Sequence, residues 1–255
     1  MTGWWGIRCV WLRYFDVYRK SIVYSVVTTF VEPMLYLVAF GFGLGGLVKT
    51  VQINGASVSY RQFIFAGIVA QTILFQAFFE AAYGAFIRMY YQRVFQAIAT
   101  TPITLSEVLW AEIIWDASKA TFASMAVLLI GTAMGDFHPV GALIALPLCF
   151  AGAFVFASLG VLVAARSRTI EEISYPQYLL IFPMFLFCGI FFPLESLPRA
   201  LQWVAWALPL TSIVSLIRTL TLGFPLRLQA FPILAIWLAV LVPWCRRSMS
   251  RRLIK

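Results

Sequence analysis

Residues 21–47 read SIVYSVVTTFVEPMLYLVAFGFGLGGL. This run is apolar over about 26 residues and is interrupted only by Glu32 and Pro33. A helix needs about 20 apolar residues to cross the roughly 30 Å hydrocarbon core of a bilayer. The run is therefore long enough to span a membrane, and it is too long for the core of a signal peptide.

The composition of the whole chain points the same way. Of the 255 residues, 62% are hydrophobic and 11% are charged, whereas a soluble domain is about half apolar and a quarter charged. The net charge of +9 would suit a nucleic-acid partner, but the charges lie between the apolar runs and at the two ends of the chain. We therefore predict an all-α membrane protein that binds no nucleic acid.

The apolar runs predict six membrane-spanning helices within one transmembrane domain, residues 1–255. The spans are expected at residues 22–47, 63–86, 117–134, 140–164, 175–192 and 229–244. Residues 4–20 are too charged to cross, and their aromatic and basic residues recur at helical spacing. This pattern is typical of an amphipathic helix that lies in the membrane interface.

Residues 193–228 are the ambiguous part of the topology. The segment Leu201–Ile217 is apolar, but Pro209 breaks it. If it does not cross, both termini share one side of the membrane with 13 of the 19 Lys and Arg residues, and five lie on the other side. The positive-inside rule then places both termini in the cytoplasm. We predict that residues 193–228 form a re-entrant pair of short helices on the outer side.

Polar residues within the first two spans are candidates for a pathway through the membrane. Glu32 is about 11 residues into the first span, or roughly 16 Å at 1.5 Å per residue. A carboxylate at mid-membrane is costly unless it is paired, protonated or hydrated. It either lines a polar pathway or ties two spans together, or it caps backbone groups freed by Pro33. The polar candidates in these spans are Glu32, Tyr36, Glu80 and Tyr83.

Charged residues also mark the start of the third span. Glu112, Asp116 and Lys119 lie at helical spacing, so the helix should begin in water before it enters lipid near Ala117. We expect local contacts among these three side chains at the inner interface, with Lys119 extending toward the cytoplasm.

The segment between the second and third spans is longer than a plain connection requires. It is amphipathic, with Tyr91, Phe95 and Ile98 at helical spacing. We predict a short helix at residues 88–101 that docks against another protein; the alternative is a helix that lies on lipid. The candidate docking residues are Arg88, Tyr91, Gln92, Arg93, Phe95, Ile98, Thr101 and Pro102.

No residue pattern for catalysis is evident in the sequence. It contains neither a phosphate-binding GxxxxGK[ST] motif nor an HExxH motif, and its single histidine is His138. Cys9, Cys149, Cys188 and Cys245 are scattered and are expected to be small apolar residues of a packed bundle. We predict that the chain is not an enzyme and binds no cofactor or metal.

Five stretches together resemble the ABC-2 family of ATP-binding-cassette exporter permeases, and within it the nodulation-protein J branch of lipo-oligosaccharide exporters. They occur in order over nearly the whole chain, from about residue 4 to residue 245. The stretches are EPMLYLVAFGFGLG (32–45), YGAFIRMY (83–90), FQAIATTPI (95–103), EIIWDASK (112–119) and FPMFLFCGIFFPLESLP (182–198).

The resemblance implies a permease of the bacterial inner membrane with the topology described above. Two permease copies would pair with two separate ATPase subunits, which hold the ATP and Mg²⁺, and residues 88–101 would be the coupling helix. The pathway would lie on the dimer-facing sides of spans one, two and five. The implied function is export of an amphiphilic or lipid-linked substrate, such as a lipo-oligosaccharide, a glycolipid or a hydrophobic drug. The alternative is an ion- or proton-coupled transporter that uses Glu32.

Overall fold

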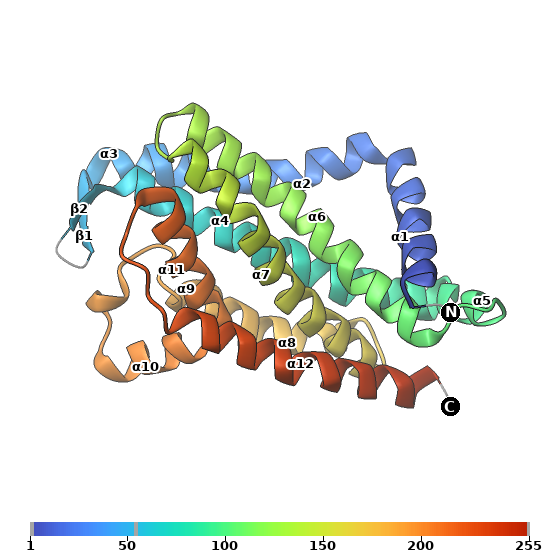
Figure 1. Ribbon diagram of the computed structural model, residues 1–255. Coiled ribbons are helices and arrows are strands. Elements are labelled where there is room, and N and C mark those ends of the chain that lie inside the picture. The colour runs from blue at the N-terminus through green and yellow to red at the C-terminus, as the bar shows by residue number, and fades with distance from the viewer. Residues whose placement is uncertain (1–2, 54–55, 254–255) are drawn as a thin grey trace.

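The chain forms a bundle of long helices that run side by side (Figure 1). The computed structural model describes residues 3–53 and 56–253. The first helix, α1 (Gly3–Lys20), stands across one end of this bundle, and the last described turn of the chain lies at the same end.

The first apolar run is one continuous helix from Ile22 to Leu47. It comprises α2 (Ile22–Tyr36), a π-helical stretch η1 (Leu37–Leu44) and α3 (Gly45–Leu47). Pro33 lies inside α2 and lacks a backbone N–H to donate. A wider π turn just after such a break is a common way for a helix to restore its hydrogen bonding.

A hairpin joins this helix to the central helix of the bundle. Strands β1 (Thr50–Ile53) and β2 (Ala56–Ser59) pair antiparallel between the first two predicted spans. The central helix then runs from Tyr60 to Tyr91, and 83% of its most apolar 18-residue stretch is buried. Its parts are α4 (Tyr60–Phe79), η2 (Glu80–Gly84) and η3 (Ile87–Tyr91).

Two long helices pack around the central one. The first is α6 (Leu105–Ala133), which begins at a capping box made by Thr104 and Glu107, well before the predicted entry into lipid. The second is α7 (Pro139–Arg166). A Cβ atom at Gly160 of α7 would lie 2.7 Å from the carbonyl oxygen of Phe78. The two backbones therefore approach closely at a glycine, as small residues permit between membrane helices.

The predicted fifth span is shorter than its apolar run. A 3-10 turn, η4 (Glu171–Ile173), leads into a helix from Ser174 to Phe187, made of α8 (Ser174–Pro176), η5 (Gln177–Ile181) and α9 (Phe182–Phe187). The helix stops before residue 192 because the chain turns at Gly189, whose φ of +79° suits glycine. A second 3-10 turn, η6 (Leu194–Ser196), follows.

The last part of the chain contains a bent helix pair and a long final helix. Helix α10 (Arg199–Ala207) and helix α11 (Pro209–Leu222) meet at an angle of 88°. Pro209 explains the break, since proline starts a helix readily and does not continue one. The chain then forms α12 (Ala230–Leu253) and returns to the end of the bundle where α1 lies (Figure 1).

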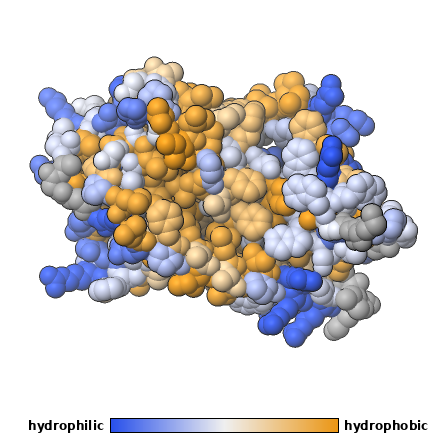
Figure 2. Space-filling view, in the orientation of Figure 1, coloured by the Kyte–Doolittle hydropathy of each residue, from blue (hydrophilic) through white to orange (hydrophobic). Residues whose placement is uncertain are grey.

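The described residues include five helices that are long and apolar enough to cross a membrane, or six if the bent pair is one span. Apolar side chains cover the middle of the visible face, and hydrophilic ones gather at both ends of the bundle (Figure 2). This pattern matches an apolar band flanked by water. The chain is therefore a mostly helical membrane protein, as the sequence predicted.

Candidate functional site

A cluster of five charged side chains lies where α1, the end of the central helix and α6 meet. Lys119 Nζ is 2.7 Å from Glu80 Oε2. Arg88 Nη1 is 3.5 Å from Glu80 Oε1, and Arg88 Nε donates a hydrogen bond of 2.7 Å to Glu112 Oε1. Arg88 Nη2 also pairs with Glu112 and lies 3.4 Å from Asp116 Oδ1. We call these five residues the charge cluster.

The helical repeat explains why these residues face one another. Glu112, Asp116 and Lys119 are four and three residues apart on α6, so they share one face of that helix. Glu80 and Arg88 face them from η2 and η3 of the central helix. The predicted local contacts among these three side chains are therefore wrong, because all three form ion pairs with the central helix instead.

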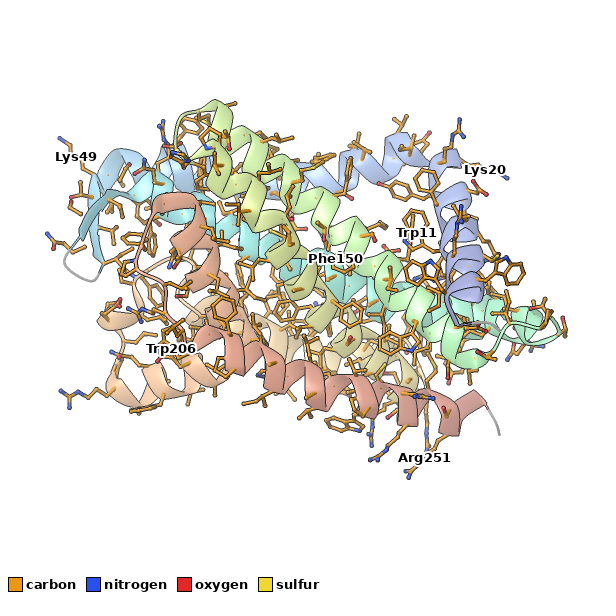
Figure 3. The ribbon with its side chains drawn as sticks, in the orientation of Figure 1. Trp11, Lys20, Lys49, Phe150, Trp206 and Arg251 are labelled. Atoms are coloured by element: carbon orange, nitrogen blue, oxygen red, sulfur yellow. The ribbon has the colours of Figure 1, made fainter. Side chains whose placement is uncertain are left out.

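Helix α1 covers the charge cluster with aromatic side chains. The Tyr14 ring lies 5.2 Å from the Arg88 guanidinium, and the Tyr18 ring lies 5.1 Å from Lys119 Nζ. Trp115 of α6 contacts both tyrosines and Trp11 at ring distances of 5.6–6.2 Å. Figure 3 shows Trp11 between α1 and the bundle. Cation–π and aromatic contacts thus attach α1 to the charged faces of two other helices.

Burial sets the protonation state of Tyr14. Desolvation, followed by the negative charge of Glu112, raises the pKa of the Tyr14 hydroxyl well above its usual value. A tyrosine is neutral at physiological pH in any case, and the raised pKa keeps the Tyr14 hydroxyl protonated at more alkaline pH as well.

The carboxylates of the charge cluster outnumber its cations by three to two. Glu112 and Asp116 are fully buried. Glu112 Oε2, Asp116 Oδ2 and the Tyr14 hydroxyl lack a hydrogen-bond partner among the described residues. A neighbouring cavity of about 360 Å³, lined by Tyr14, Glu80 and Arg88 among others, is large and polar enough to hold several waters.

The structure changes the predicted helix at residues 88–101. Arg88 belongs to the last turns of the central helix, and its side chain is held inside the charge cluster. The chain then breaks at Arg93, which has a left-handed φ of +51°. Only α5 (Val94–Ala99) forms a separate short helix, so the expectation of one helix over residues 88–101 is wrong.

The predicted apolar docking face of this segment is also wrong. Phe95 and Ile98 are only 1% and 8% exposed because they pack into the core of this chain. Tyr91 points elsewhere and is 69% exposed. The side chains that α5 and its flanks leave exposed are mainly polar: Gln92, Arg93, Gln96, Ala97, Thr100, Thr101 and Pro102.

Glu32 faces outward from this chain. It lines a groove of about 590 Å³ along α2 and η1, together with Tyr36 and apolar residues of the same helix. No ion pair or hydrogen bond links Glu32 to the part of the chain that the structure describes. Only 19% of the most apolar 18-residue stretch of this helix is buried. Of the two roles left open for Glu32, capping of backbone groups near Pro33 has no hydrogen bond to support it among the described residues.

Tyr83 connects the central helix to the Ser174–Phe187 helix. Its hydroxyl donates a hydrogen bond of 2.9 Å to Gln177 Oε1. Tyr36 of the first span contacts Phe185 of the same helix at a ring distance of 6.2 Å. Three of the four polar candidates of the first two spans therefore contact another helix. Tyr36 and Tyr83 lie beside the Ser174–Phe187 helix, whereas Glu80 belongs to the charge cluster.

Sequence reasoning missed several residues that hold the bundle together. Tyr14 and Tyr18 were assigned to an interfacial helix and not to the charge cluster. At the other end, Arg61 pairs with Asp136 over 2.9 Å, and Arg218 donates to the carbonyl oxygens of Phe63 and Ile190 over 3.3 Å each. For Arg61, Asp136 and Arg218 the only signal was a charge next to an apolar run, and such a charge does not identify its partner.

Comparison with known proteins shows the family of this chain. The family model described as "ABC-2 type transporter" matches residues 6–222. The chain belongs to the ABC-2 type transporter family. This match confirms the resemblance found in the sequence.

Relatives of this ABC-2 chain cover nearly all of its length. It is 33% identical to nodulation protein J of Rhizobium leguminosarum bv. viciae over 248 residues, which are 96% of this chain and 94% of the relative. It is 34% identical to nodulation protein J of Rhizobium meliloti (strain 1021), over 87% of this chain and 83% of the relative. The inner membrane transport permease YadH of Escherichia coli (strain K12) is 21% identical over 83% of this chain and 81% of its own.

Proposed function

We propose that the chain is the permease subunit of an ABC exporter that is driven by separate ATPase subunits. The observation that supports this most strongly is the charge cluster. It connects the central helix, α6 and α1 at the end of the bundle where α5 lies (Figure 1). The family resemblance implies that the segment containing α5 faces the ATPase.

The charge cluster offers a physical route from the ATPase to the spans. Displacement of α5 by the ATPase subunit would be transmitted to the central helix across the short break at Arg93. Arg88 would pass the displacement to α6 through Glu112 and Asp116, and to α1 through Tyr14. Buried ion pairs resist separation because each charge is costly without its partner. The three helices are therefore expected to move together.

The proposed topology places both termini in the cytoplasm. Six crossings are counted, with the short Ser174–Phe187 helix as the fifth and the α10–α11 pair as a re-entrant hairpin on the outer side. Helix α1 would lie in the cytoplasmic interface. In support, Lys20 and Arg251 lie at one end of the bundle and Lys49 at the other (Figure 3).

We propose that two permease copies face each other through the exposed side of the first spanning helix. This side leaves a carboxylate, Glu32, at mid-membrane depth with no ion-pair or hydrogen-bond partner among the described residues, so we expect a second copy or the cargo to supply a polar environment. The proposed cargo is amphiphilic or lipid-linked, as the family resemblance implies. A charge requirement at Glu32 would instead favour a proton- or ion-coupled transporter.

Paired substitutions in α5 test the coupling role. We expect Gln96→Glu to lower transport and transport-linked ATP hydrolysis while leaving the unfolding temperature unchanged, because Gln96 is exposed. Phe95→Asp should instead lower the unfolding temperature, because it buries a carboxylate in the core.

Cross-linking supplies the direct measurement. In a Cys9→Ser background, Gln96→Cys should cross-link to the ATPase subunit, and His138→Cys, exposed between α6 and α7, should not. Failure of Gln96→Cys to cross-link in an assembled, ATP-hydrolysing complex would reject the docking role of α5.

A further inference from the structure

A basic cavity lies apart from the charge cluster, between the C-terminal turns of α12 and the first turns of α6. Its volume is about 560 Å³. Trp110 lines it from α6. All the other lining residues belong to α12 and include three arginines, Arg246, Arg247 and Arg251.

The cavity changes from apolar to basic along α12. Val242 and Pro243 line its inner part, the first two arginines lie one turn further on, and Ser250 and Arg251 lie a turn beyond those. Residues four apart share one face of a helix, so the lining forms a continuous strip. An amphiphile with an apolar tail and a polar head changes from apolar to polar in the same order along its length.

Trp110 holds the apolar side of the cavity in place. Its ring stacks on Phe154 of α7 at 6.1 Å with an interplanar angle of 22°. Tryptophan favours the boundary between hydrocarbon and headgroups. Its presence therefore marks the depth at which a headgroup would meet the cavity.

The positive charge of the cavity is not neutralised by the described part of the chain. All three arginines are exposed, none forms an ion pair with a described residue, and no carboxylate lines the cavity. A fourth arginine, Arg166, lies nearby with its guanidinium 5.6 Å from the Trp244 ring. Hydrophilic residues gather at this corner of the molecule (Figure 2), and Arg251 extends away from the bundle (Figure 3).

We propose that this cavity binds the phosphate headgroup of an anionic phospholipid of the cytoplasmic leaflet. Guanidinium groups bind phosphate through paired hydrogen bonds, and basic pockets at helix ends on this side of a membrane suit anionic lipids. The leaflet assignment rests on the proposed topology. Binding itself does not depend on transport, so the two proposals can fail separately.

Two serines of α12 provide a matched pair of variants. Ser250 lines the cavity and Ser248 does not. Ser250→Glu and Ser248→Glu change the net charge equally, but only the first places a carboxylate on the lining of the cavity. Native mass spectrometry of the purified full-length chain with phosphatidylglycerol or phosphatidylcholine would count the lipids retained.

We expect the wild-type chain to retain phosphatidylglycerol in preference to phosphatidylcholine. Ser250→Glu should reduce the retained phosphatidylglycerol at least about five-fold, the effect of one surface charge on anionic-lipid binding. Ser248→Glu should behave as the wild type. Arg247→Gln is a second variant with the same expected loss, in case Ser250→Glu does not fold.

Several results would overturn the proposal. Equal losses in both serine variants would show general charge attraction without a site, as would no lipid preference in the wild type. Competition by millimolar inorganic phosphate would indicate a free-anion site. If Ser250→Glu retained its lipid but no longer co-purified with the ATPase subunit, the cavity would belong to the subunit interface.

Discussion

Arg88 is the residue on which the charge cluster depends, since it contacts three carboxylates and the Tyr14 ring. Without it, Glu112 and Asp116 would be two buried carboxylates with no ion-pair partner among the described residues. Breaking a buried ion pair by removing one partner is far more costly than breaking an exposed one.

We expect Arg88→Met to lower the free energy of unfolding by about 3–5 kcal/mol, the cost of leaving buried charges unpaired. The measurement is unfolding of the purified chain in detergent. Arg93→Met removes the same charge from an exposed side chain and should change stability by less than about 0.5 kcal/mol. Equal effects in the two variants would mean that the charge cluster contributes nothing specific.

Glu32 presents the opposite situation, since it has no partner within its own described chain. We expect Glu32→Leu to leave the helical content of the permease unchanged and to lower the fraction of complexes that contain two permease copies. Glu32→Gln should retain most assembly and transport, because an amide still forms hydrogen bonds. Light scattering and vesicle transport assays measure the two quantities.

The outcome for Glu32→Gln separates the competing functions. Loss of transport with assembly and basal ATP hydrolysis intact would show that the negative charge itself is needed, as a proton- or ion-coupled carrier requires. Normal assembly and transport in Glu32→Leu would contradict any intramembrane role for this residue.

Between elements, packing depends on glycines where two backbones meet. A Cβ atom at Gly141 of α7 would lie 1.8 Å from the carbonyl oxygen of Leu220 in α11. Side chains cannot relieve this contact, because the obstructing atom belongs to the backbone. The bent α10–α11 pair is therefore held against α7 only while residue 141 has no side chain.

We expect Gly141→Ala to destabilise the protein by at least about 1–3 kcal/mol, the range for overpacked cores. The unfolding temperature of the purified chain reports this directly. Gly46→Ala is the matched control, since nothing lies within 4 Å of a Cβ atom there, and alanine favours helix over glycine. A stable Gly141→Ala protein would show that α7 and α11 can separate without cost.

At the scale of the whole molecule, the charge distribution sets the expected orientation. Thirteen of the 19 basic residues are assigned to the side of the termini, and positive charge is retained in the cytoplasm. In a Cys9→Ser background, a cysteine at Thr100 should react with a membrane-impermeant maleimide only after cells are opened. One at His138 should react in intact cells. The reverse pattern would invert the topology and move the basic cavity to the outer leaflet.

The positions of most spans followed from the sequence because apolar run length is a local property. Residues 22–47 illustrate this, since the observed helix occupies the same residues. The membrane class followed from composition, and the family followed from several motifs that occur in order along the chain. The short helix at Ser174–Phe187 did not follow, because an apolar run does not reveal where its backbone turns.

Tertiary structure alone decided which charges meet and which side chains face inward. The sequence placed Glu112, Asp116 and Lys119 on one helix face, but their partners Glu80 and Arg88 depend on how two helices are rotated against each other. The same holds for Phe95, whose spacing suited a docking face and whose side chain is buried in its own chain. Periodicity defines a face of a helix, whereas only packing determines what that face contacts.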